Sequence, residues 1–149
     1  MMTRKQHVDY WLHGASENLK DMRSAIKSKR RTNAMFCGHL CVEKMLKALC
    51  AVRNIPIHRE HKLLVLAKDS GHINQLSAVE QQELLTITSF NIEARYDDYK
   101  RRFHAICTPY YTDIWSKNIS KYYKSIKAIV LLERSTLPNK EPDFQKLIT

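Results

Sequence analysis

The residues best suited to chemistry in this sequence are His39, Glu43 and Lys47, which recur at every fourth position. They stand in an otherwise apolar segment, residues 36–49 (FCGHLCVEKMLKAL). An α-helix has about 3.6 residues per turn, so positions i, i+4 and i+8 lie on one side of it. We therefore predict a helix that is buried on most sides and carries one line of polar groups, which we call the polar stripe. If the polar stripe is buried, its charges need partners, and it becomes a candidate site.

Two interpretations of the polar stripe are open. Glu43 precedes Lys47 by one helical turn, which is the favourable order for an ion pair worth about 0.2–0.5 kcal/mol when exposed. In the first interpretation the stripe is a structural salt-bridge network at a helix interface. In the second its side chains face a groove and contact a ligand, to which Lys47 adds charge.

A second polar segment, residues 92–102 (IEARYDDYKRR), places arginine and lysine among tyrosines. Arg and Lys pair with phosphate groups and aromatic faces stack on bases, so this composition suits a nucleotide or an RNA strand. Arg95 then holds phosphate, and Tyr96 stacks or hydrogen-bonds. The alternative is that Arg95 pairs with a carboxylate and fixes the segment to the rest of the protein, since charge pairs within connectors are common. The candidate carboxylates are Asp97, Asp98 and Glu43.

A third polar segment, residues 58–63 (HREHKL), follows a loop that contains Pro56. We expect His61 to close one end of a groove lined by the polar stripe, Arg95 and Tyr96. The candidate ligand-binding residues are therefore His39, Glu43, Lys47, His61, Arg95, Tyr96 and Lys100.

Motifs for common catalytic and cofactor chemistries are absent from the sequence. It holds no GxSxG, no glycine-rich phosphate loop and no His-Glu-x-x-His. Cys37 and Cys41 have a spacing that metal sites use, but no second ligand pair stands at zinc-finger spacing. We interpret the cysteines as reduced core thiols, and we assign no catalytic residue, no metal and no cofactor.

The composition is that of a basic protein with a single core. The chain has 149 residues, and 25 Lys and Arg against 15 Asp and Glu give a formal net charge of +10. That charge favours a polyanionic partner such as nucleic acid, a nucleotide or an acidic protein, although a solvated basic surface has the same composition. No apolar run approaches the ~18 residues of a membrane span, and the N-terminal segment lacks the apolar core of a signal peptide. We therefore expect a cytoplasmic protein.

Helices must position these side chains, because Gly and Pro are scarce (3 and 4 residues) and no strand pattern is present. The predicted helices span about residues 5–27, 32–53, 62–68, 77–90 and 112–134. Their predicted caps are Thr32 or Asn33 for the second, a capping box of Ser77 and Glu80 for the fourth, and Thr112 for the last. Residues 93–109 are expected to form an ordered connector with a helical turn near Arg101.

The predicted fold class is all-α, an antiparallel up-and-down bundle of four to five helices. Gly71 ends the third helix, because glycine tolerates the left-handed conformation that a helix end needs. The domain is expected to span residues 1–134. Residues 135–149, which hold two prolines, are expected to form a C-terminal tail.

Taken in order, these segments resemble a HEPN domain. The matching positions are Trp11 and Ala15, the pattern Phe36-x-x-His39-Leu40-x-x-Glu43-Lys44-x-Leu46-Lys47-Ala48, then Pro56, then His61, Leu63 and Leu66, and residues 90–96 with 98–100. The resemblance covers residues 8–134 and rests on the order and spacing of all these pieces. The connector of the family commonly reads Ala-Arg-Tyr-Pro, whereas this chain has Asp97 in place of the proline.

The resemblance implies a helical bundle that is usually dimeric or larger, so we expect a homodimer or a higher homo-oligomer. Family members are often encoded beside small nucleotidyltransferases and act with them in toxin–antitoxin pairs. Many are ribonucleases that use an Arg-x4–6-His motif near the start of the last long helix. The guanidinium stabilises phosphate charge there, and the imidazole moves protons.

This chain lacks that motif where the resemblance places it, because residues 112–134 contain no histidine. The leading hypothesis is therefore a non-catalytic HEPN module that binds a nucleotide or a nucleic acid, partners a small nucleotidyltransferase, or does both. One alternative is a metal-independent ribonuclease toxin that uses Arg53 with His58 across a dimer. A second candidate pair for it is Arg102 with His104. The other alternative is a plain oligomeric interaction scaffold.

Overall fold

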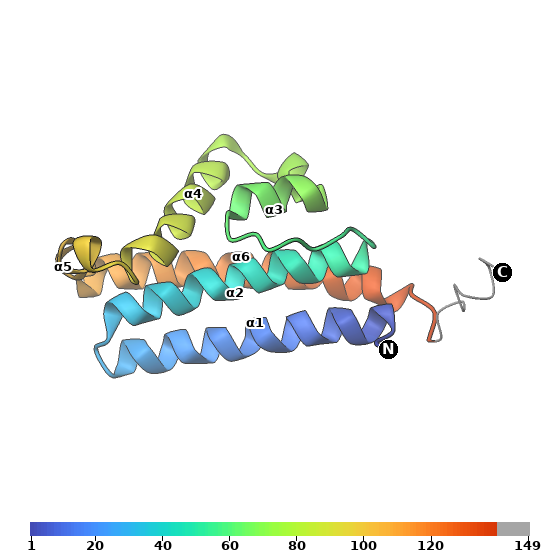
Figure 1. Cartoon of the computed structure of the whole chain (residues 1–149), viewed down its shortest axis with the longest axis horizontal. Helices are drawn as coiled ribbons and strands as arrows, with labels where there is room; N and C mark the ends of the chain where they lie inside the picture. The colour runs from blue at the N-terminus through green and yellow to red at the C-terminus, as the bar shows by residue number, and fades with distance from the viewer. Residues whose placement is uncertain (140–149) are drawn as a thin grey trace.

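Figure 1 shows the computed structural model of the chain, which describes residues 1–139. Helices make up its regular structure, and no strand occurs among those residues. In chain order the helices are α1 (Arg4–Lys27), α2 (Arg31–Val52), α3 (Leu63–Ser70), the 3₁₀ helix η1 (His72–Gln75), α4 (Ala78–Glu93), α5 (Asp97–Ile106) and α6 (Pro109–Ser135). The predicted all-α bundle is confirmed.

Three long helices, α1, α2 and α6, lie side by side, and α3 and α4 pack on α2 (Figure 1). α1 runs antiparallel to both α2 and α6. α2 and α6 run in the same direction, because α3, η1, α4 and α5 carry the chain back to the end at which α2 begins. At that end the junction of α5 and α6 faces the turn between α1 and α2.

Local sequence determines where α1 begins. Thr3 Oγ1 accepts a hydrogen bond from the Gln6 N–H (3.1 Å), and Gln6 Oε1 accepts one from the Thr3 N–H (2.9 Å). This reciprocal capping box satisfies two backbone donors that the helix leaves free. The buried face of α1 has the predicted helical spacing and consists of Val8, Ala15, Asn18, Leu19, Met22 and Ala25.

α2 is the central helix of the bundle and is buried along most of its length, as predicted. It contacts α1, α3, α4, α5 and α6. Gly38 allows the close approach of α6, because a Cβ at this position would overlap the side chain of Ile119. The central position of α2 means that polar side chains on it must find partners inside the protein.

The predicted cap of α2 at Thr32 or Asn33 is wrong. α2 begins at Arg31, and its N-cap residue Arg30 makes no side-chain hydrogen bond to the first helical turn. The reason lies in the link to α1, where Lys29 has a left-handed φ of 60° and reverses the chain abruptly. The chain is therefore already helical at Arg31.

The predicted cap of α6 at Thr112 is also wrong, because α6 begins at Pro109. Thr108 is the N-cap, and its Oγ1 accepts a hydrogen bond from the Tyr111 N–H (3.1 Å). Proline suits the first helical position because its fixed φ matches the helix and its missing N–H has no partner there. Thr112 instead lies buried within the helix.

The predicted end of α3 and the predicted start of α4 are confirmed. Gly71 follows α3 with a left-handed φ of 83°. Ser77 Oγ accepts from the Glu80 N–H (3.1 Å), and Glu80 Oε1 accepts from the Ser77 N–H (3.1 Å), which completes the expected capping box of α4. Both signals are local, so packing elsewhere does not alter them.

Residues 97–106, predicted to hold one helical turn, form the complete helix α5. Asp97 and Asp98 occupy its first turn, where carboxylates interact favourably with the helix dipole. Phe103 is its buried residue, and the Phe103 ring centroid lies 5.5 Å from that of Phe90 on α4. Tyr99, Phe103 and Ile106 stand at the helical spacing i, i+4 and i+7, so this helix has a local signal that the prediction of a single turn underestimates.

All four cysteines, Cys37, Cys41, Cys50 and Cys107, are free and buried. Burial raises the pKa of the Cys41 and Cys107 thiols to about 12. These thiols are therefore protonated near neutral pH and pack as small apolar side chains.

No helix within residues 1–139 is both long enough and apolar enough to cross a membrane. α6 continues to Ser135. After this helix, Asn139 Oδ1 accepts a hydrogen bond from the ammonium group of Lys5, which lies in the first turn of α1 (2.8 Å). Most of the expected C-terminal tail, residues 140–149, lies outside the described residues.

Candidate functional site

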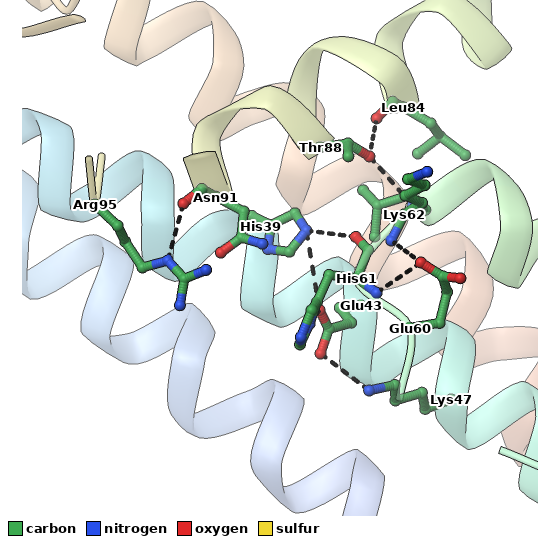
Figure 2. Close-up of polar contacts among 11 residues, drawn as sticks. His39, Glu43, Lys47, Glu60, His61, Lys62, Leu84, Thr88, Asn91 and Arg95 are labelled. Atoms are coloured by element: carbon green, nitrogen blue, oxygen red, sulfur yellow. Dashed lines mark hydrogen bonds and ion pairs between the residues drawn. The ribbon is translucent and has the colours of Figure 1, made fainter. Parts of the chain in front are cut away.

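The polar stripe lies inside the protein, on the side of α2 that faces the loop before α3 (Figure 2). His39 is 0% exposed, Glu43 4% and Lys47 6%. Ionisable side chains are seldom buried this deeply unless neighbouring groups satisfy them. The contacts of these side chains therefore decide between a ligand site and a structural network.

Both oxygens of the Glu43 carboxylate have partners. Oε1 accepts a hydrogen bond from His61 Nδ1 (2.8 Å), and Oε2 accepts one from the Lys47 ammonium (3.1 Å). The Lys47 ammonium also lies 5.3 Å from the ring centroid of Trp11 on α1, close enough for a cation–π contact. The charge of the stripe is thus matched within the protein.

His39 is held in one tautomer by the backbone. Its Nε2 lies 2.9 Å from the carbonyl oxygen of His61, and because a carbonyl only accepts, Nε2 carries the hydrogen. Burial lowers the pKa of His39, an effect that the hydrogen bond to His61 and the Glu43 charge partly oppose. The ring is therefore neutral near pH 7, and within residues 1–139 its Nδ1 has no hydrogen-bond partner.

The loop that carries His61 is fixed on both sides of this residue. Glu60 Oε1 accepts hydrogen bonds from the N–H groups of His61 (3.0 Å) and Lys62 (2.9 Å). Thr88 Oγ1 accepts from the Leu63 N–H (3.2 Å) and donates to the Leu84 carbonyl (2.8 Å), which ties the loop to α4. The loop and the stripe thus form one network that holds the loop on α2, and the side chain of His61 is 59% exposed at its outer edge.

Arg95 lies outside this network, at the C-terminal end of α4 (Figure 2). Its side chain is exposed, and its Nε donates to the carbonyl of Asn91 (3.2 Å). The guanidinium carbon lies 5.9 Å from the ring centroids of both Phe36 and Tyr96. Among residues 1–139 no carboxylate lies within ion-pair distance of Arg95, so the expected pairing with Asp97, Asp98 or Glu43 does not occur there.

Arg95 lines an open hollow of about 330 Å³, which we call the Arg95 hollow. It is formed by Thr32, Asn33, Phe36, Ala94, Arg95 and Lys100. Lys100 pairs with Asp97 (3.4 Å), but both side chains are largely exposed, so this contact is weak. The structure therefore brings Arg95, Tyr96 and Lys100 together, and it groups His39, Glu43, Lys47 and His61 separately instead of around one groove.

A second hollow, of about 500 Å³, adjoins the first and was not expected from the sequence. We call it the Arg31 hollow; it is lined by Lys29, Arg30, Arg31, Thr32, Asn33, His104, Ala105, Cys107 and Thr108. Thr32 and Asn33 belong to both hollows, and we call the two together the basic end. The run KSKRR at residues 27–31 is its sequence signal, but only the fold shows that α5 lies opposite this run.

The family is decided by comparison with known proteins. A family model described as HEPN domain matches residues 8–130. The chain belongs to the HEPN domain family. Comparison with curated proteins and with solved structures gives no match. Membership of the HEPN family supports a role that relates to nucleotides or RNA.

In this HEPN domain one arginine of the ribonuclease alternative, Arg53, is bound within the chain. Arg53 is engaged by Glu133 of α6, with Nε–Oε1 and Nη2–Oε2 distances of 2.8 Å each, and by the carbonyl of Ser70 (2.6 Å). The hydrogen bond from Arg53 holds the pKa of Glu133 below its usual value. His58 is exposed on the loop between α2 and α3.

The second candidate pair lies on α5, where Arg102 and His104 are both exposed. Of the two, His104 lines the Arg31 hollow. Within the described residues no cluster of three or more His, Cys, Asp or Glu side chains is arranged to hold a metal ion.

Proposed function

We propose that this HEPN-domain protein is a non-catalytic module that binds the phosphate of a nucleotide or a nucleic acid in the Arg95 hollow. The proposal rests on Arg95, whose guanidinium is exposed and has no carboxylate partner in the described chain. A guanidinium presents several donors in one plane and pairs with phosphate through two hydrogen bonds. The Nε of Arg95 donates to the Asn91 carbonyl (3.2 Å), which leaves its two Nη groups to pair with the phosphate of a ligand.

Aromatic rings beside Arg95 extend the same chemistry to a base. The half-buried Phe36 and the exposed Tyr96 flank its guanidinium at equal centroid distances of 5.9 Å. Stacking of a base on an aromatic face is worth about 1–3 kcal/mol. Lys100 supplies a further positive charge at the rim of the hollow. Its ion pair with Asp97 is exposed and weak, so a bound phosphate can replace the Asp97 carboxylate. Phosphate contact and base stacking together favour a nucleotide unit over a simple anion.

The polar stripe supports the non-catalytic part of the proposal. Its carboxylate is occupied by His61 and Lys47, and its imidazole is buried. A general acid or base must reach the proton that it transfers. His39 and Glu43 are buried and have no open access to a ligand. Arg53 donates hydrogen bonds to Glu133, so these donors are not available to a phosphate group.

The partners expected from the resemblance are part of this proposal. We propose a cytoplasmic protein that forms a homodimer or a higher homo-oligomer and acts with a small nucleotidyltransferase in a toxin–antitoxin-like pair. The basic net charge of +10 supports a polyanionic ligand, since it raises the local concentration of such molecules. Light scattering of the purified chain, and co-purification with a neighbouring nucleotidyltransferase, test the assembly separately from the ligand.

Titration of the folded protein with ATP by calorimetry, and with a fluorescein-labelled oligoadenylate RNA by anisotropy, tests the ligand. We expect Arg95→Ala to weaken binding at least about tenfold, because hydrogen bonds to charged groups contribute about 1.5–3 kcal/mol. Arg59→Ala is the matched control, since it removes the same exposed charge from the loop over the polar stripe. No binding of either probe at millimolar concentration, or equal losses in both variants, would overturn the proposal.

A further inference from the structure

We propose that the Arg31 hollow binds a second phosphate of the ligand held in the Arg95 hollow, which makes that ligand a single-stranded nucleic acid. This inference rests on the proposed function and deepens it. Two separate elements bring groups that can bind phosphate to this hollow: the cations Lys29, Arg30 and Arg31 from the turn into α2, and the imidazole of His104 from α5. Its volume of about 500 Å³ is within the range of ligand sites in proteins.

The cations of the Arg31 hollow have no acidic partners in the described chain. No carboxylate of residues 1–139 lies within ion-pair distance of Lys29, Arg30, Arg31 or His104, and the lining of the hollow contains no Asp or Glu. Other surface lysines do have such partners, for example Lys117 with Asp113 (3.0 Å). Like charges held together without compensation repel one another, and an anion bound among them relieves that repulsion.

The two hollows lie next to each other. Thr32 and Asn33, in the first turn of α2, line both of them. A chain of phosphodiesters that leaves the Arg95 hollow past Thr32 and Asn33 therefore meets the Arg31 hollow next. The hydroxyl of Thr32 and the amide of Asn33 offer hydrogen bonds to the sugar between the two phosphates. One nucleotide has no second phosphodiester to use this arrangement.

Exposed tyrosines near the basic end favour a single strand over a duplex. Tyr96 is 54% exposed beside Arg95, and Tyr110 is 77% exposed two residues after Thr108, which lines the Arg31 hollow. Proteins that bind single strands combine a basic groove with aromatic side chains on which bases stack. In a duplex the base faces are already stacked on one another and are closed to such side chains.

The test compares two double variants in anisotropy titrations with a fluorescein-labelled oligoadenylate RNA decamer at several salt concentrations. Arg31→Gln with His104→Gln removes one cation and one imidazole from the Arg31 hollow. Arg59→Gln with His58→Gln is the matched control, because it changes the same residue types at exposed positions of the loop between α2 and α3. Circular dichroism confirms that each variant is folded. Competition by AMP, and by the decamer in a duplex with oligouridylate, completes the set.

We expect the Arg31/His104 variant to bind the decamer at least about tenfold more weakly than the control, with a salt slope shallower by about 0.7 for each lost phosphate contact. AMP and the duplex should compete far less well than the free decamer. Unchanged decamer affinity in the Arg31/His104 variant, or competition by AMP or duplex equal to that of the decamer, would overturn the second subsite while leaving the Arg95 result intact. Failure of the proposed function is a different outcome: Arg95→Ala would then leave decamer affinity unchanged.

Discussion

The polar stripe and the basic end both include residues of α2 and use similar residue types, but their charges are satisfied in different ways. In the stripe, Glu43 accepts from both His61 and Lys47, and all of the stripe is buried. At the basic end, Arg31 and Arg95 have no carboxylate partner within residues 1–139. A line of charges on a central helix is therefore not in itself a binding site. The site is proposed where charge lacks an internal partner.

This difference separates stability from binding. Removal of a group from a closed buried network leaves another group unpaired, so the cost falls on folding. Removal of an exposed cation leaves no group unpaired inside the protein, so it lowers the affinity for the ligand and not the stability of the fold. Single variants in the two regions should therefore give opposite results in unfolding and binding measurements.

The largest effect is expected for Glu43→Ala. This variant leaves the buried Lys47 without its partner, and loss of one member of a buried pair costs about 3–5 kcal/mol in the free energy of unfolding. Urea denaturation followed by circular dichroism measures this change. Glu17→Ala is the control, since it breaks an exposed pair with Lys20 and should change stability by less than about 0.5 kcal/mol.

A double variant sharpens the same prediction. Glu43→Leu together with Lys47→Leu replaces the buried pair by apolar groups, and such replacements are often neutral or stabilising. The double variant should therefore be more stable than Glu43→Ala. If Glu43→Ala were as stable as the native chain but lost affinity for RNA, the polar stripe would be a ligand site after all.

The next largest effect is expected for Arg53→Ala. Arg53 is bound by Glu133, whereas Arg95 has no carboxylate partner among residues 1–139. Loss of Arg53 breaks the hydrogen bonds to Glu133 and to the Ser70 carbonyl, and we expect a destabilisation of about 1–3 kcal/mol. Thermal unfolding measures it, and affinity for RNA should not change. Arg95→Ala should show the reverse. An Arg53→Ala protein of native stability that no longer cleaved or bound RNA would instead support the ribonuclease alternative.

A smaller effect is expected when the pH is lowered. Burial lowers the pKa of both His39 and His72, so the folded state keeps these rings neutral while the unfolded state takes up protons below its ordinary histidine pKa of about 6.5. The unfolded state then binds more protons, and stability falls as the pH drops. Denaturation at pH 7 and pH 5.5 should show a loss of about 1 kcal/mol or more. Equal stability at the two pH values would mean that these rings are not held neutral.

The smallest effect is expected for Lys100→Ala, at the rim of the Arg95 hollow. Its pair with Asp97 is exposed, so the free energy of unfolding should change by less than about 0.5 kcal/mol. Affinity for the RNA decamer should fall about two- to threefold, well below the loss for Arg95→Ala, because an exposed lysine contributes mainly long-range charge. A loss as large as that of Arg95→Ala would place the phosphate at Lys100.

Features set by neighbouring residues could be predicted from the sequence. The capping box of Ser77 and Glu80 and the end of α3 at Gly71 depend only on local hydrogen bonds and backbone freedom, and both occur as predicted. The spacing of the polar stripe likewise predicted which residues share one side of α2. The pairing of Glu43 with Lys47 was one of the two interpretations of that pattern, and the structure contains it.

Features that depend on tertiary packing could not be predicted in this way. Sequence spacing does not show that His61 reaches back to Glu43, nor that Arg95 is directed away from it. The Arg31 hollow requires the α5 residue His104 to lie opposite the turn into α2, which no local pattern contains. The early start of α2 follows from the link geometry at Lys29, which overrides the preference for a Thr or Asn cap. The early start of α6, in contrast, has a local signal, because Thr108 caps the helix and Pro109 occupies its first position.

The most direct test of the separation between these two regions is a titration of ¹⁵N-labelled protein with the oligoadenylate decamer, followed by amide chemical shifts. We predict that the amides of Thr32, Asn33 and Arg95 shift progressively, while those of His39 and Glu43 stay in place. Shifts concentrated at His39 and Glu43, with the basic end unaffected, would contradict the proposal that RNA binds at the basic end and not at the polar stripe.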